Sequence, residues 1–366
     1  MKWGRGTHDA KLKLSSAVAI ALALGVSTAH SEENTSSPWQ ISLSTGTQTE
    51  NLPTFDAPVG DTFVVGYPGL ISEKFNPTLR GGEGNIGYTT RSGWNIELGG
   101  GYWTGDDSTS AQPVYDVNTN AYSLAVTGGD GVSGVLLGTS VLEGDRVYAS
   151  VDASLAEAHI RLARDVKADG IIVHPFMGLI YERSSHDYTA SFRLAEPQVG
   201  NLEIPYAYSQ GIVSSRLGGD VGVKFTVPLD ENLQFHASAA FALFHQASDM
   251  SARDCVARAQ FSPGFACEDT TAFNYTRLLS TSVSDDDDRL ASRVKLEAGM
   301  SYLTSFGVLN LNAFAQYDSA VAGVKNPVLT QDQFLGGDPT RPPPSHLVFD
   351  DAWSYGGKVM LIVPLQ

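Results

Sequence analysis

The pattern that most constrains this chain is an alternation of apolar and polar residues with a period of two. From Trp353 to Leu365 every odd-numbered position is apolar, aromatic or glycine, whereas Ser354 and Lys358 occupy the opposite face. Because successive side chains of a β-strand point to opposite faces, this pattern predicts a strand with one apolar and one polar face. The alternation recurs in further segments, namely 221–227, 233–243, 294–302 and 309–317. The sequence therefore favours an all-β fold.

The connections between the candidate strands alternate in length. Residues 51–80 form a long connection and residues 91–92 a short one, and the order repeats as far as the long connection 320–351. Short turns at one end and long loops at the other are typical of an antiparallel transmembrane β-barrel. We expect about ten strands in one barrel domain over residues 32–366. The candidate strands are 39–48, 81–90, 93–103, 146–164, 170–184, 209–227, 232–247, 289–303, 307–319 and 352–365.

Two segments fit a ten-stranded barrel less well, and one other fold competes with it. Residues 118–142 are apolar for an external loop, so a further hairpin and twelve strands are the alternative. Within 146–164 the apolar residues move from odd to even positions, which predicts a β-bulge near Leu155. Periodicity alone does not separate a barrel from a secreted soluble β-sandwich that binds a ligand through its loops.

Aromatic residues fall near the ends of the candidate strands, where a membrane barrel carries its two interfacial girdles. Those expected at the periplasmic rim are Trp39, Trp94, Phe235, Tyr302 and Phe306, and those expected at the outer rim are Tyr102, Trp103, Tyr181, Tyr317, Trp353 and Tyr355.

The first thirty-one residues have the order of a signal peptide. Basic residues, among them Arg5 and Lys11, precede an uninterrupted apolar segment from Ala17 to Val26, and small residues follow it. This apolar segment is too short for a spanning helix and has the usual length for a signal sequence. We therefore expect residues 1–31 to be removed during export, and the rest of the chain to be located in the cell outer membrane.

The charge balance argues against nucleic acid as a partner. The chain has 40 acidic and 24 basic residues, a net charge of −16, and phosphate binding needs clustered Lys and Arg. Removal of residues 1–31 leaves 39 acidic and 20 basic residues, a net charge of −19. Acidic runs at 106–107, 285–288 and 350–351 are read as solvated loops. The alternatives are attraction of cations at a pore mouth and divalent bridging to lipopolysaccharide.

The chain has two cysteines, Cys255 and Cys267, in a stretch rich in Asp, Pro and Gly. In an oxidising compartment this spacing predicts a disulfide that closes one loop. No histidine lies between them, so we expect no metal site there and no cofactor.

Charged residues on the polar faces are candidates for the barrel interior. Counting back from the short turns predicts that His159 faces His174, Lys224 faces His236, and Arg293 faces Asp318. The two readings are cross-strand ion pairs that plug a narrow barrel and a small polar pore lined by these residues. The His159–His174 pair lacks a third ligand, so we expect no metal. The pore-lining candidates are Glu97, Asp152, Glu157, His159, Arg161, His174, Glu182, Asp220, Lys224, His236, Arg293, Lys295, Glu297, Asp318 and Lys358.

Motifs of barrel enzymes are not recognisable in the chain. His186-Asp187 and His245 with Ser248 stand at predicted rims, but the sequence has no GxSxG elbow, no HExxH and no phosphate-binding glycine loop. We therefore expect no enzymatic activity.

The order of three short motifs resembles the pore-forming Legionella-type major outer membrane protein family. These motifs are Val151-Asp152, Gly178 to Tyr181 and Arg216 to Asp220, and the similarity covers roughly residues 147–245. It implies a porin-like outer-membrane barrel, with surface adhesion as a further role.

Taken with the alternation, the resemblance leads us to expect a narrow channel for small solutes or cations. The alternative is a structural or adhesive surface barrel without an open pore. The expected partners are outer-membrane lipid, lipopolysaccharide and the barrel-assembly machinery, and the oligomeric state is left open.

Overall fold

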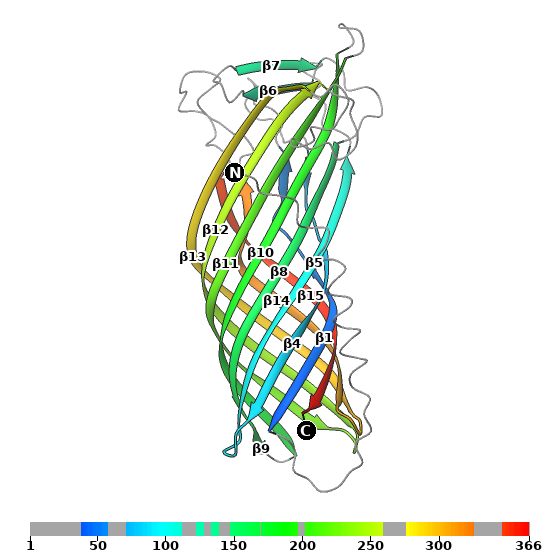
Figure 1. The fold of residues 1–366 in the computed structure, drawn as a ribbon, viewed down its shortest axis with the longest axis vertical. Helices are drawn as coiled ribbons and strands as arrows, with labels where there is room; N and C mark the ends of the chain where they lie inside the picture. The colour runs from blue at the N-terminus through cyan, green and yellow to red at the C-terminus, as the bar shows by residue number, and fades with distance from the viewer. Residues whose placement is uncertain are drawn as a thin grey trace. The chain divides into compact units, whose positions relative to one another are not determined.

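The computed structural model describes residues 38–57, 71–111, 122–127, 133–138, 147–168, 170–196, 202–258, 276–325 and 346–365 (Figure 1). Residues Pro38–Leu365 form one compact unit. The predicted signal peptide, residues 1–31, lies outside the described residues, and so does Cys267 of the predicted disulfide. No helix among the described residues is long and apolar enough to cross a membrane.

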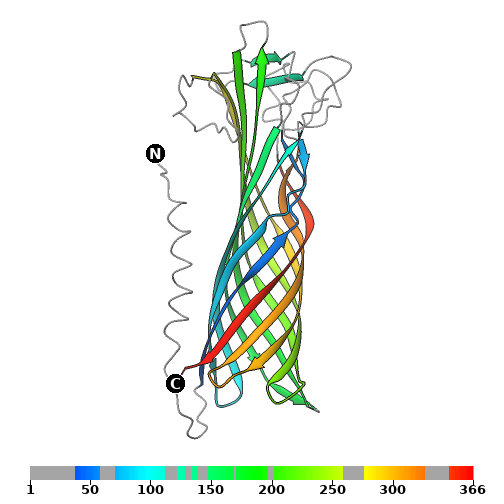
Figure 2. The ribbon, with the colours of Figure 1, turned by 90° about the vertical axis from the view of Figure 1, so that its right-hand side faces the viewer.

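Ten antiparallel strands close into a barrel, as the alternation predicts. They follow one another round the barrel in chain order, and β15 pairs with β1 to close it (Figures 1 and 2). This closed ladder excludes the soluble sandwich. The strands are β1(Trp39–Glu50), β4(Thr78–Thr89), β5(Trp94–Ala111), β8(Val147–Arg164), β10(Ile171–Glu196), β11(Leu202–Pro228), β12(Leu233–Arg258), β13(Thr276–Leu303), β14(Val308–Lys325) and β15(His346–Pro364).

Short strands outside this ladder explain why the barrel has ten strands and not twelve. The apolar segment 118–142 does contain a hairpin, β6(Tyr122–Thr127) and β7(Ser133–Gly138), but its strands pair only with each other. Strands β2(Phe55–Ala57) and β3(Ile71–Glu73) also form a separate pair. Strand β9(Val166–Ala168) prolongs the turn between β8 and β10.

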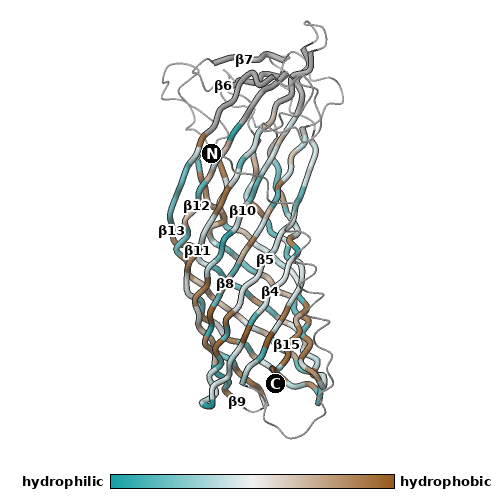
Figure 3. Tube along the Cα trace, viewed as in Figure 1, coloured by the Kyte–Doolittle hydropathy of each residue, from teal (hydrophilic) through white to brown (hydrophobic). Residues whose placement is uncertain are grey.

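The half of the barrel that carries the short turns has an apolar exterior. Leu43 on β1 is 43% exposed, whereas its neighbours Ser42 and Ser44 are buried inside. Leu217 on β11 and Leu296 on β13 are exposed in the same way, and Figure 3 shows hydrophobic and hydrophilic residues alternating along these strands. An exterior of this kind fits a lipid environment. In water each exposed leucine would lack the stabilisation of about 1.5–3 kcal/mol that removing its side chain from water provides.

The aromatic girdles are present, with one correction. Trp39 contacts Tyr88 at the turn end, with ring centroids 4.7 Å apart, and Tyr317 contacts Trp353 at the outer end of the apolar belt, with centroids 5.3 Å apart. Trp103 was expected in the outer girdle, but its side chain points inward and is buried. It packs against Leu79 and Ala153 inside the barrel.

Beyond the outer girdle the pattern of the strands inverts. Val151 points inward and is fully buried, whereas Asp152 lies exposed on the outer wall. Tyr188 and Asp187 on β10 repeat this arrangement. The same strand therefore has a lipid-facing pattern in one half and the pattern of a soluble protein in the other. The β-bulge predicted near Leu155 does not exist, since β8 keeps a continuous register with both neighbours.

This inversion also explains why the strands extend beyond their predicted ends. Strand β10 continues to Glu196 and β13 begins at Thr276, in segments that the sequence predicted to be external loops (Figure 2). The acidic runs 106–107, 285–288 and 350–351 consequently lie on strands, which corrects their assignment to loops.

The register confirms one predicted cross-strand pair and corrects two. Arg293 faces Asp318. His159 faces Ile180, not His174, because the turn lies further along the chain, beside Gly170 with φ +81°. Lys224 faces Ser238 rather than His236, because the turn closes on Leu233, whose carbonyl accepts hydrogen bonds from Leu229 and Asp230.

Strands β13 and β14 separate halfway along the barrel. Their ladder ends at the pair Arg293–Asp318, although β13 continues outward to Thr276. Directly after Asp318, β14 contains a bulge, where Ser319 and Ala320 stand against the single residue Asp351 of β15. Such a bulge bends the strand and ends regular pairing. We call this point the fork.

Candidate functional site in the barrel lumen

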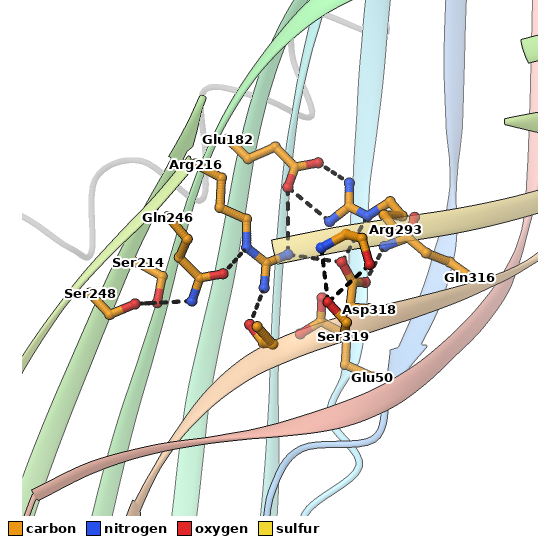
Figure 4. A network of polar contacts seen from close by, with 12 residues as sticks. Glu50, Glu182, Ser214, Arg216, Gln246, Ser248, Arg293, Gln316, Asp318 and Ser319 are labelled. Carbon is orange, nitrogen blue, oxygen red and sulfur yellow. Dashed lines mark hydrogen bonds and ion pairs between the residues drawn. The ribbon is translucent and has the colours of Figure 1, made fainter. Parts of the chain in front are cut away.

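A chain of ion pairs crosses the lumen at the level of the fork. Arg293 on β13 binds both carboxylate oxygens of Glu182 on β10, and its Nε donates to Asp318 Oδ1 on β14 at 2.9 Å (Figure 4). Arg216 on β11 donates from Nη1 to the same Asp318 oxygen, also at 2.9 Å. Three strands lie between β10 and β14 in the barrel order, so these contacts bridge well-separated parts of the wall. We call Glu182, Arg216, Arg293 and Asp318 the charge network.

Neutral side chains satisfy the remaining polar atoms of the charge network. Arg216 Nε donates to Gln246 Oε1 at 2.7 Å, and Gln246 Nε2 donates to Ser248 Oγ at 3.0 Å. Gln316 Nε2 donates to Asp318 Oδ2 at 2.8 Å (Figure 4). Buried charges are costly unless they are paired and hydrogen-bonded. These hydrogen bonds therefore allow four charged side chains to lie in the centre of the barrel.

The charge network also holds the bulge of β14. Arg216 Nη2 donates to the carbonyl oxygen of Ala320 at 2.7 Å, and this carbonyl belongs to the bulge itself. The carbonyl has left the ladder and would otherwise be a buried acceptor without a partner. Arg216 thus fixes both the ion pairs of the lumen and the bend that produces the fork.

A second set of charges fills the lumen nearer the short turns. Arg161 Nε lies 2.9 Å from Asp220 Oδ2, and Lys358 Nζ lies 3.4 Å from Glu297 Oε2. His159 stands between two carboxylates, with Nδ1 3.1 Å from Glu157. Its Nε2 lies 3.3 Å from Glu97. These contacts pair opposite charges inside the membrane-spanning half of the lumen.

On the side of the charge network away from the short turns, a cluster of apolar and aromatic side chains fills the lumen. Phe55 of β2 stacks on Tyr188 of β10, with ring centroids 4.9 Å apart and planes 6° apart, and Phe75 also contacts Tyr188. Tyr188 lies beyond the membrane-spanning segments, and burial raises the pKa of its hydroxyl. We call the whole set the outer core: Leu52, Phe55, Phe75, Ala149, Val151, Tyr188, Ala190, Tyr208, Ile212, Met250, Ala252, Ala322, Val324 and Leu347.

The segment between β1 and β4 supplies the centre of the outer core. The backbone N–H of Leu52 donates to the carbonyl of Phe75 at 3.1 Å, which joins the two ends of this segment. The N–H of Asn51 donates to the carbonyl of Trp353 on β15 at 3.1 Å, and the N–H of Asn76 donates to Asp107 Oδ2 on β5 at 2.9 Å. These two hydrogen bonds thereby tie the segment to β15 and β5, the strands that flank β1 and β4 in the barrel.

A small cavity of about 50 Å³ separates the outer core from the charge network. Its lining includes His186, whose Nε2 lies 3.5 Å from Glu50 Oε2, and Ser354, whose buried Oγ has no hydrogen-bond partner among the described residues. A space of this size holds a few water molecules, which would satisfy Ser354. It is too small for a solute.

All but one of the predicted pore-lining residues point toward the lumen. The exception is Asp152, which lies exposed on the outer wall because the pattern of β8 inverts there. The side chains turned toward the lumen are Glu97, Glu157, His159, Arg161, His174, Glu182, Asp220, Lys224, His236, Arg293, Lys295, Glu297, Asp318 and Lys358. Their role in conduction stays a prediction.

Sequence reasoning missed residues that are central to the site. Arg216 shares the even-numbered, inward face of β11 with Asp220 and Lys224, so the alternation contained the signal. Glu83 on β4, 3.9 Å from Lys358, was missed in the same way. Within the described ranges, no group of three or more His, Cys, Asp or Glu residues is arranged to hold a metal ion.

The chain was compared with protein-family models, curated proteins and solved structures. No protein-family model matches the chain, and no curated protein matches its sequence. The outer membrane protease OmpT from Escherichia coli is similar over 92% of this chain and 99% of its own, with 10% identity and a TM-score of 0.39. The translocator domain of the autotransporter NalP from Neisseria meningitidis is similar over 98% of this chain and 97% of its own, with 12% identity and a TM-score of 0.25.

A FadL homologue from Pseudomonas aeruginosa is similar over 90% of each chain, with 9% identity and a TM-score of 0.21. At such identities the likeness concerns the fold alone. The closed ladder and its apolar exterior make the chain an antiparallel β-barrel of the transmembrane kind. Its resemblance to the Legionella-type family stays a prediction, since no family model matches.

The expectation that the chain has no enzymatic activity requires correction. It rested on missing motifs, but the barrels to which this chain is similar include a protease. Missing motifs therefore do not exclude catalysis in a barrel of this class, and we withdraw the exclusion.

Proposed function

We propose that this protein is an outer-membrane barrel closed to diffusion, which supports a folded surface structure beyond the membrane. The charge network carries the proposal, because Arg293, Glu182, Arg216 and Asp318 connect strands across the lumen and are buried. A solute path at this level would have to separate paired, desolvated charges. Parting one such pair costs about 3–5 kcal/mol.

The outer core supports the same proposal. Residues of the segment between β1 and β4 occupy the centre of the lumen above the charge network, and Phe55 packs between Phe75, Tyr188 and Tyr208. Porin interiors are polar and filled with water. An apolar, aromatic interior in the outer half instead provides a rigid base for the long strands and the surface they present.

The narrow channel for small solutes or cations is the second candidate. It is favoured by the acidic and basic side chains on the inward faces of the strands, among them Glu97, Lys224 and Lys295. In that case the charge network and the outer core would have to move during conduction.

Swelling of liposomes that contain the purified, folded barrel separates the two candidates. A closed barrel leaves the swelling rate in a small sugar or an amino acid equal to that of empty liposomes. A known open porin in the same lipid serves as the positive control, and the gel shift between unboiled and boiled samples checks folding. Swelling that depends on solute size would overturn the closed barrel in favour of the channel.

A further inference from the structure

Among the residues that the structure describes, the fork leaves one edge of β13 without a partner strand. Beyond Arg293, β13 pairs with β12 on one side, and no described strand pairs with its other side. The β6–β7 hairpin lies near the outer end of β13 but forms no ladder with it (Figure 1). An unpaired edge presents a row of backbone donors and acceptors to any extended chain that reaches it.

One hydrogen bond shows which backbone groups face the fork. The N–H of Ser292 donates to Ser319 Oγ on β14 at 2.8 Å, where a continued ladder would use a backbone carbonyl. Alternate residues of a strand direct their N–H groups to the same side. The N–H groups of Leu290, Asp288 and Asp286 therefore also face the fork, and their side chains lie exposed on the outer wall.

The other contacts across the fork come from side chains on the inner face. The Arg289 guanidinium lies over the ring of Phe349 on β15, 3.3 Å from its centroid. Asp285 Oδ2 accepts a hydrogen bond of 2.8 Å from the N–H of Leu347. These contacts hold β15 against the inner face of β13, and neither of them engages the backbone N–H groups from Asp286 to Leu290.

The charge beside this edge selects the kind of strand that fits. Asp286 and Asp288 are exposed along it, and Asp249 of β12 stands directly beside Asp286. Cross-strand pairs of opposite charge are stabilising, and like charges placed opposite one another are destabilising. Two copies of this acidic edge would repel each other, so a cationic strand is the better match.

We propose that the outer edge of β13, from Asp286 to Leu290, docks an extended cationic peptide segment of another protein as an added strand. Main-chain hydrogen bonds to Asp286, Asp288 and Leu290 would provide affinity, and lysine or arginine side chains beside the two aspartates would provide selectivity. This docking edge lies outside the lumen, so the proposal holds whether the barrel is closed or conducting.

The test uses the full chain in lipid nanodiscs and a fluorescein-labelled peptide of alternating lysine and valine. We expect saturable binding, measured by fluorescence anisotropy. The control peptide has the same sequence with every second amide N-methylated, which keeps its charge but prevents it from forming a strand ladder. Its affinity should be at least tenfold lower. Equal affinity of the two peptides would show charge attraction without strand addition and overturn the proposal, as would no binding.

Matched variants locate the binding. Asp286→Asn/Asp288→Asn should weaken binding at least fivefold, whereas Asp152→Asn/Asp187→Asn should not change it. The second pair removes the same charge from exposed, adjacent positions of β8 and β10, where both edges of each strand are already paired. Asp288→Pro removes one free N–H and should also weaken binding, with folding checked by the gel shift. Equal effects of the two double variants would overturn the assignment to β13.

Discussion

Arg293 on β13 and Asp318 on β14 form the last pair of the ladder between these strands, and their side chains are also ion-paired, with Nε 2.9 Å from Oδ1. The charge network therefore stands where the wall of the barrel divides. Arg216 extends the connection, because it binds both Asp318 and the bulged carbonyl of Ala320. The proposed closure of the lumen and the separation of β13 from β14 depend on the same few side chains.

Removing one partner of the charge network should destabilise the barrel strongly. Arg293→Ala leaves Glu182 and Asp318 buried with fewer donors, and we expect a loss of about 3–5 kcal/mol in the free energy of unfolding. Urea titration followed by tryptophan fluorescence measures it. Asp152→Asn, on the exposed wall, is the control and should change this energy by less than about 0.5 kcal/mol. Similar losses for the two variants would contradict the assigned role of the network.

The segment between β1 and β4 should depend on Phe55 for its position. Phe55→Ala removes the ring stacked on Tyr188, and truncation of a buried phenylalanine typically costs about 3–5 kcal/mol. We expect limited proteolysis to cut the variant between β1 and β4 much faster than the wild type, while the barrel stays folded. Phe306→Ala, at an exposed short turn, should leave the cutting rate unchanged. A rate that does not respond to Phe55→Ala would show that the outer core does not anchor this segment.

Ser319 should protect one amide of β13. Because Ser319 Oγ accepts the hydrogen bond of the Ser292 N–H, Ser319→Ala should expose that amide to exchange. A net hydrogen bond is worth about 1 kcal/mol, so exchange at Ser292 should accelerate about fivefold. Hydrogen exchange read by mass spectrometry or NMR measures the effect, with Val294, inside the ladder, as the internal control. Unchanged exchange at Ser292 would mean that a backbone ladder persists beyond Arg293.

The free energy of unfolding should depend on pH through Asp187, which lies on the outer wall beyond the membrane-spanning segments. Burial and, to a smaller extent, the charge of Asp152 raise the pKa of the Asp187 carboxyl. A carboxyl with a raised pKa in the folded state binds its proton more tightly there, so stability falls as pH rises from its unfolded pKa through its folded pKa.

Asp187→Asn should therefore be more stable than the wild type at neutral pH, by about 0.5 kcal/mol or less because the site is exposed. The difference should shrink as pH falls to about 4, the ordinary range of an aspartate. Unfolding measured at both pH values checks this, and Asp152→Asn should give part of the same gain. A larger advantage at low pH would contradict the sign.

The sequence predicts the membrane-spanning half of this fold well, because lipid outside and polar groups inside make the alternation unambiguous. It predicts the outer half poorly. There Val151 points inward and Asp152 points outward. If the apolar face is assumed to meet lipid along the whole strand, this reversal predicts a β-bulge, which does not exist. The register of a hairpin depends on where its turn closes. Because the turn between β8 and β10 lies beside Gly170, His159 faces Ile180 and not His174.

The candidate site was predictable only in part. The pairing of Arg293 with Asp318 follows from a short turn and is confirmed. The contact of Arg293 with Glu182 joins residues 111 positions apart in the chain, and no local pattern indicates it. The fork depends on a bulge held by Arg216 from another strand, which periodicity does not reveal.

The central claim is that the charge network and the outer core close the lumen. Single-channel recording of the folded wild-type protein in planar lipid bilayers tests it most directly, with insertion confirmed by a labelled fraction of the protein. We predict that inserted barrels produce no stepwise conductance in 1 M KCl. Regular, reproducible conductance steps from the wild-type barrel would contradict the claim and establish an open pore.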